Sequence, residues 1–180
     1  VLNAESDNGT AIGVWTSYYT KATFGGEKLT INSTSKAGDA VGTIAVWSPK
    51  VVYSAKDTII NAASSSGNVY GVDIDNHTQS VPNDLYPSAV VNHTGNVKIN
   101  AQSRDQEAFG VYVHSAKPNK ESGTDQGGAA NFSKELNIKA VSANSNATGI
   151  FVSGAPITDE NGEVLFTSGQ ASVNTSGDTT

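Results

Sequence analysis

Four ionisable residues lie close together in the middle of the chain, and their types could support two kinds of chemistry. They are Asp73, Asp75, His77 and Asp84. Clustered carboxylates can act as general acid and base, or can hold Ca²⁺ through their oxygens. Asp73 and Asp75 are two residues apart, so on a β-strand both side chains would point to the same face. Cleavage of a polysaccharide would need further carboxylates or a basic residue beside them.

Aromatic side chains form a second group that could carry function. Trp15, Tyr112 and Phe151 each follow a glycine by two residues, and Trp47 and Tyr86 lie in connecting segments. Flat aromatic rings suit the faces of sugars and the centres of protein interfaces. The same rings could instead stabilise the fold by packing under loops or by stacking on one another.

An internal repeat places both groups. Each copy has an aliphatic anchor followed by a polar residue, then by Ala or Ser, and eleven residues after the anchor comes a glycine. Five copies in register predict a repeat protein. The anchor and glycine pairs are Leu2–Gly13, Ile31–Gly42, Ile60–Gly71, Ile99–Gly110 and Ile138–Gly149.

Each copy predicts three short strands, in stretches such as 51–53, 97–101 and 108–113. Apolar and polar residues alternate in these stretches, and β-branched residues are frequent, which favours strand over helix. Strands that stack on their equivalents in the next copy predict an all-β, right-handed parallel β-helix of about five rungs.

The differences in length between copies fall after the third strand. The predicted insertion loops are 75–89, 114–128 and 153–163, all at one corner of the β-helix. Loops on a rigid scaffold often carry binding function, although tolerated insertions are an equal possibility. Because the chain begins within a strand and ends just after a new copy starts, we expect residues 1–180 to be a single β-helix fragment of a longer array.

The glycines of the repeat are predicted to be structural. Side chains before and after each glycine would face inward with opposite parity, which indicates a bend in the third strand. In the second copy the aliphatics of 43–46 come one residue late, so we expect a local shift of that strand. The five glycines are Gly13, Gly42, Gly71, Gly110 and Gly149.

An asparagine follows several of the anchors and should point outward. Asn32, Asn61 and Asn100 occupy this column, where amides of successive rungs can hydrogen-bond to one another. Asn-x-Ser/Thr triplets at Asn8, Asn76 and Asn92 could alternatively accept glycans.

Composition excludes several classes of function. Charged residues make up 16% of the chain, the net charge is −6, and Arg104 is the single arginine, so nucleic-acid binding is not expected. No apolar run is long enough to span a membrane, and the absence of cysteine excludes a disulfide framework. No cofactor is predicted.

Catalysis is not predicted either. At the position of Asp73 the other copies carry hydrophobic residues, and Arg104 should lie at a distant corner. The acidic stretch 159–163 is typical of a surface turn, so no metal site is predicted. A polysaccharide-degrading enzyme of the pectate-lyase or tailspike type remains the alternative. The residues at the Asp73 position are Trp15, Ile44, Tyr112 and Phe151.

The recurring Ile-Asn-Ala segment and the later Ala-x-Gly-Val segment resemble the passenger domains of Gram-negative autotransporter adhesins. The resemblance implies display on the bacterial surface, beyond the outer membrane, by a C-terminal barrel. It implies adhesion to a host-cell, matrix or bacterial surface protein or glycan, with self-association possible. Under this interpretation the ligand-binding residues are the five aromatics Trp15, Trp47, Tyr86, Tyr112 and Phe151, on the face that bears the loops.

Overall fold

The computed structural model is all-β over the residues that it describes, and no helix occurs among them. That part of the chain accordingly has no helix capable of crossing a membrane. The described ranges are 1–18, 20–46, 49–75, 89–115, 128–154, 157–158, 164–166 and 171–180.

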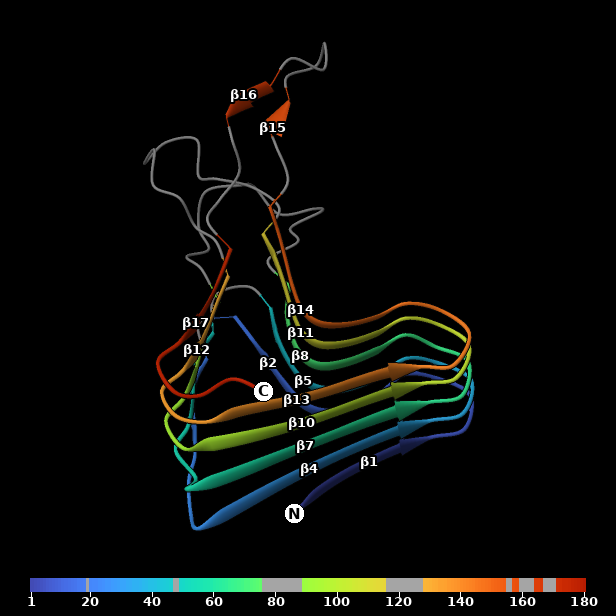
Figure 1. The fold of residues 1–180 in the computed structure, drawn as a ribbon, viewed down its shortest axis with the longest axis horizontal. Helices are drawn as coiled ribbons and strands as arrows, with labels where there is room; N and C mark the ends of the chain where they lie inside the picture. Colours follow the sequence, from blue (N-terminus) through green and yellow to red (C-terminus); the bar gives the residue numbers. More distant parts are fainter. Residues whose placement is uncertain are drawn as a thin grey trace.

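Three parallel sheets stack their strands in sequence order (Figure 1). Sheet A contains β1 (Leu2–Ser6), β4 (Lys28–Ser35), β7 (Asp57–Ser64), β10 (Asn96–Ser103) and β13 (Leu136–Ser142). Sheet B contains β2 (Ala11–Ser17), β5 (Ala40–Val46), β8 (Val69–Asp75), β11 (Ala108–Ser115) and β14 (Ala147–Gly154). Sheet C contains β3 (Lys21–Phe24), β6 (Lys50–Tyr53), β9 (Val90–His93), β12 (Ala129–Phe132) and β17 (Ser172–Thr175).

The chain passes through sheets A, B and C in turn and then repeats. We call one such passage a rung. The two remaining described strands, β15 (Ile157–Thr158) and β16 (Val164–Phe166), pair antiparallel apart from the three sheets. The predicted all-β, parallel, β-helix-like repeat is therefore confirmed. Most of the three predicted insertion loops lies outside the described residues, as do His77 and Asp84.

The anchors form the centre of the core. Ile31, Ile60 and Ile99 are fully buried, and β7 alternates between partly and fully buried residues along its whole length. Ile60 pairs with Ile99 across the two strands, and the residues that follow them, Asn61 and Asn100, pair with each other and point outward. Period-2 alternation thus separates a hydrophobic interior from a polar face, and burial of the apolar columns supplies the main stabilisation.

At the first four glycines of the repeat, an added Cβ would meet an anchor isoleucine and the backbone of the glycine in the next rung. A Cβ on Gly71 would meet the side chain of Ile99 and would lie 2.5 Å from the carbonyl oxygen of Gly110. Neither neighbour can yield, because one is core and the other is backbone. Gly149 differs, since its Cβ would find only Ile138, at 4.0 Å, and β14 has no further strand beside it in sheet B.

The strand of the second copy is not shifted, contrary to the expectation from residues 43–46. β5 stays in register on both sides, and Ile44 pairs with Trp15 and with Asp73. Thr43 takes the inward position that Val72 has in the next rung and is buried. A β-branched threonine fits the space of valine, and its hydroxyl hydrogen-bonds with the Tyr53 side chain.

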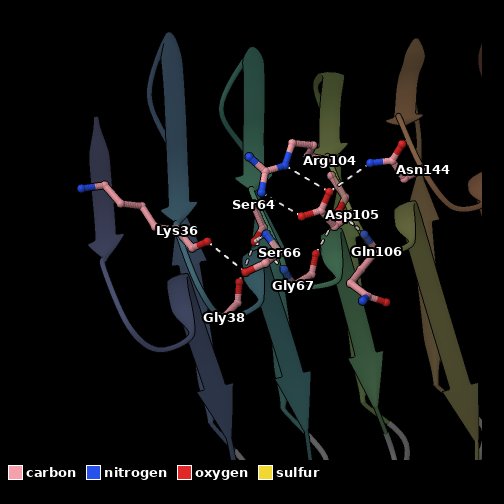
Figure 2. Close-up of polar contacts among 10 residues, drawn as sticks. Lys36, Gly38, Ser64, Ser66, Gly67, Arg104, Asp105, Gln106 and Asn144 are labelled. Atoms are coloured by element: carbon pink, nitrogen blue, oxygen red, sulfur yellow. Dashed lines mark hydrogen bonds and ion pairs between the residues drawn. The ribbon is translucent and has the colours of Figure 1, made fainter.

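Serine side chains hold the turns between sheets A and B. Ser64 donates to the carbonyl of Gly38 in the previous rung (2.7 Å) and accepts from the amide of Gly67 in its own turn (2.9 Å). Figure 2 shows this turn column. The hydroxyls of Ser35, Ser103 and Ser142 likewise bond to backbone groups of two rungs, which the strands do not pair. Ser6, in the first rung, accepts from the amide of Gly9. The serines in this column are Ser6, Ser35, Ser64, Ser103 and Ser142.

Arg104 lies in the same turn column and pairs with the adjacent carboxylate of Asp105 at 2.8 Å (Figure 2). Hydrogen bonds from Arg104 and Asn144 hold the pKa of Asp105 below its usual value. The pair is exposed, and solvent screening makes its contribution to stability small.

Candidate binding surfaces

An aromatic cluster covers part of the outer face of sheet B. Tyr112 and Phe151 are stacked, with ring centroids 5.0 Å apart and planes 7° apart. Tyr70 and Phe109 are stacked in the neighbouring column, at 5.4 Å and 10°. We call these four residues the outer aromatic cluster. It arises because equivalent positions of β8, β11 and β14 lie directly beside one another in a parallel sheet.

The two columns lock together by edge-to-face contacts. Phe109 meets Tyr112 at 5.2 Å and Phe151 at 5.7 Å, and Tyr70 meets Tyr112 at 5.4 Å. Such geometry places the positive edge of one ring on the negative face of another. Phe109 is only 8% exposed, whereas Phe151 is 37% exposed. The cluster therefore has a buried base and an accessible edge.

Of the five predicted aromatic residues, the structure places Tyr112 and Phe151 in contact with each other. Trp15 is 59% exposed, but Ile44 and Asp73 occupy the two strands between it and Tyr112. Trp47 and Tyr86 lie outside the described residues. Tyr70 and Phe109, which were not predicted as ligand-binding residues, complete the cluster. Their position one residue before each repeat glycine was the available signal.

Asp73, the first of the four predicted ionisable residues, is largely buried in the structure. Asp73 is 9% exposed on the outer face of β8, beside Ile44 and Tyr112 in the adjacent strands. Burial, and secondarily the charge of Asp73, raises the pKa of the Tyr70 hydroxyl well above its ordinary value. A general base must reach its substrate, and Asp73 has little accessible surface to do so.

Metal binding has no geometric basis in the part of the chain that the structure describes. Within that part, no three His, Cys, Asp or Glu side chains come together as a metal site would require. The acidic segment 159–163 lies outside it.

A second candidate surface is the outer face of sheet A. Asn32 donates its side-chain amide to Asn3 (2.8 Å), Asn61 donates to Asn32 (2.8 Å), and Asn100 donates to Asn61 (2.7 Å). The hydrogen-bonded asparagine column that the sequence suggested is thus present. In the next strand Lys139 takes the equivalent position.

Two shallow depressions lie on this face. One, of about 300 Å³, is lined by residues of β4, β7 and β10 around the asparagine column. The other, of about 320 Å³, is lined by the first halves of the same strands and by residues at the start of β13, and it includes Lys98. The sequence prediction placed binding at the aromatic face and missed these depressions, because a hollow depends on the sizes of side chains in three neighbouring strands.

Sheet C also carries an asparagine column, from Asn92 through Asn131 to Asn174, with amide hydrogen bonds of 2.8 Å. Asn92, which belongs to one of the Asn-x-Ser/Thr triplets, accepts a hydrogen bond from Asn131 through its side-chain oxygen.

Comparisons with protein-family models, with curated proteins and with solved structures find no match to this chain.

Proposed function

We propose that this chain is a binding module of a surface-displayed bacterial adhesin, and that it recognises a host-cell, matrix or bacterial surface protein or glycan. In this proposal the three sheets form a right-handed β-helix of about five rungs within a longer array. The module is displayed outside the outer membrane, and it binds its ligand without changing it.

The outer aromatic cluster is the observation that carries the proposal. Aromatic side chains dominate the energy of many interfaces because they bury a large area at little cost in conformational entropy. Here the rings are already packed against one another, so binding would immobilise few side chains. The accessible edge, formed by Phe151 and the half-buried Tyr112, lies on β14 and β11 of sheet B, whose strands lead into the predicted loops.

A glycan and matrix-protein array tests this function. The double variant Tyr112→Ala and Phe151→Ala should lose at least tenfold in affinity for at least one array ligand that the wild-type chain binds. A matched control truncates two half-buried outward side chains of sheet C, Val52→Ala and Val90→Ala, and should bind as the wild type does. Equal binding by the aromatic variant and the wild type would contradict the proposal.

The alternative of a polysaccharide-degrading enzyme is tested by the same preparation. Incubation with acidic polysaccharides and ultraviolet detection of unsaturated products would reveal lyase activity. Turnover that disappears in Asp73→Ala would favour the enzyme over the adhesin.

A further inference from the structure

The depression around the asparagine column of sheet A has an uncharged lining. It is formed by Asn32, Ser33, Thr34, Asn61, Ala62, Ala63, Asn100 and Gln102. None of these side chains ionises near neutral pH. The polar side chains that face the depression are amides and the hydroxyl of Thr34, because Ser33 is buried and donates to the carbonyl of Ala11.

Ala63 creates the hollow. It lies in register with Thr34 of β4 on one side and with Gln102 of β10 on the other, and all three belong to the outward column beside the asparagines. The methyl group of Ala63 is much shorter than its neighbours, so the surface sinks between Thr34 and Gln102. The half-buried alanine thus forms the floor of a site with longer polar side chains on both sides.

The asparagine column presents a regular array of hydrogen-bonding groups. An amide has two N–H donors and two acceptor lone pairs. Within the column, Asn32 and Asn61 each use one donor and one lone pair. One donor and one acceptor remain for a ligand at each of these residues, and they recur at the strand spacing of about 4.8 Å.

We propose that this face binds a neutral oligosaccharide, laid across β4, β7 and β10. A sugar hydroxyl donates and accepts at once, which matches an amide with one free group of each kind. A pyranose unit in an extended glycan advances by a distance close to the strand spacing, so successive sugars meet successive asparagines. A peptide advances only about 3.3 Å per residue and would fall out of step. The lining of this depression contains no cationic side chain to pair with an anionic glycan.

The neighbouring depression can extend the site. Its charged lining residues balance, with Lys28 and Lys98 against Asp57 and Glu135. Asp57 also accepts a hydrogen bond from Asn96 (3.0 Å). This surface adds hydroxyl-binding groups without adding net charge. The site does not depend on the outer aromatic cluster, which lies on a different sheet.

Nuclear magnetic resonance of the nitrogen-labelled chain provides the test. Linear neutral tetra- to hexasaccharides of glucose or mannose should shift the side-chain amide signals of Asn32, Asn61 and Asn100. Oligogalacturonate of the same length should shift them at least tenfold more weakly at equal concentration. Ala63→Ile fills the hollow and should reduce the affinity at least tenfold.

Two controls keep the test decisive. Ala129→Ile makes the same change at a half-buried outward alanine of sheet C and should bind as the wild type does. The double variant Tyr112→Ala and Phe151→Ala should bind the neutral oligosaccharide as the wild type does, which distinguishes this site from the outer aromatic cluster. If Ala63→Ile does not fold, Ala63→Thr copies the residue at Thr34 and replaces it. Absence of shifts with every neutral oligosaccharide, preference for oligogalacturonate or for an extended peptide, or unchanged affinity in the folded Ala63 variant would each overturn the proposal.

Discussion

The imidazole of His93 is stacked in parallel on the ring of Tyr53 inside the core, with centroids 4.6 Å apart and planes 9° apart. Phe132 stacks on its other face at 4.9 Å, and Phe24 continues the column beyond Tyr53 at 5.1 Å. Both imidazole nitrogens are buried and have no hydrogen-bond partner. A titratable ring therefore occupies a position that the neighbouring rungs give to phenylalanine or tyrosine.

This burial predicts a loss of stability in acid. It lowers the pKa of His93 from 6.5 to about 3. The unfolded chain binds a proton below about pH 6.5, whereas the folded chain does not do so until about pH 3, so the free energy of unfolding falls as the pH falls between these values. The slope from this one group is about 1.4 kcal/mol per pH unit.

Substitution isolates the effect. His93→Phe should be at least as stable as the wild type at pH 7, and its advantage should grow by about 2 kcal/mol on going to pH 5. Urea unfolding at both pH values measures this. Tyr53→Phe is the control, because its difference from the wild type should not change with pH. An advantage of His93→Phe that stays constant would show that His93 takes up its proton in the folded state.

The repeat glycines predict a steric effect. Gly71→Ala should destabilise the fold by about 1–3 kcal/mol, because the new Cβ meets the core side chain of Ile99 and the backbone of Gly110. Gly9→Ala, where the nearest atom to the new Cβ is the hydroxyl of Ser6 at 3.5 Å, should change stability far less. Thermal unfolding distinguishes the two, and equal melting temperatures would contradict the steric explanation.

The inward and outward columns of sheet A predict losses of stability of very different size when a charge is introduced. Ile99→Asp places a charge in a fully buried position and should cost several kcal/mol. Asn100→Asp only replaces the amide that donates to Asn61, at a cost of about 1 kcal/mol. Denaturant titration of both variants provides the comparison, and similar losses would mean that the burial of the two columns is not as described.

Within the outer aromatic cluster, stability and binding should separate. Phe109→Ala removes a ring that is almost fully buried and touches Tyr70, Tyr112 and Phe151, so a loss of about 3 kcal/mol is expected. Phe151→Ala removes a more exposed ring and should cost markedly less. Calorimetric unfolding of the two variants tests this. A greater loss of stability from Phe151→Ala would show that the structural role belongs to Phe151 and not to Phe109.

The sequence predicted the parallel, β-helix-like stacking because the repeat anchors align every column at once. Once Ile60 and Ile99 face inward, period 2 decides that Asn61 and Asn100 face outward. The same register predicted that Tyr112 and Phe151 are neighbours. It also separates Trp15 from them, because Ile44 and Asp73 stand between, although the predicted site grouped all three.

Contacts made through the backbone could not be predicted in the same way. Ser64 follows the inward parity of Ala62, where the alternation leads one to expect an apolar side chain. Its partners are a carbonyl and an amide in two different turns, and the side-chain pattern does not reveal where those groups point. The depth of the hollow at Ala63 was missed for a similar reason, since it depends on Thr34 and Gln102 from other rungs.

The parallel pairing between rungs has a mechanical consequence. Backbone hydrogen bonds connect each strand to its equivalent in the next rung, 29 to 43 residues further along the chain, so they point along the direction in which the rungs are stacked. A pulling force in that direction loads these bonds in tension, and the bonds at the outermost rung bear it first. The stack should therefore peel open under load in discrete steps, each of which releases the length of one repeat.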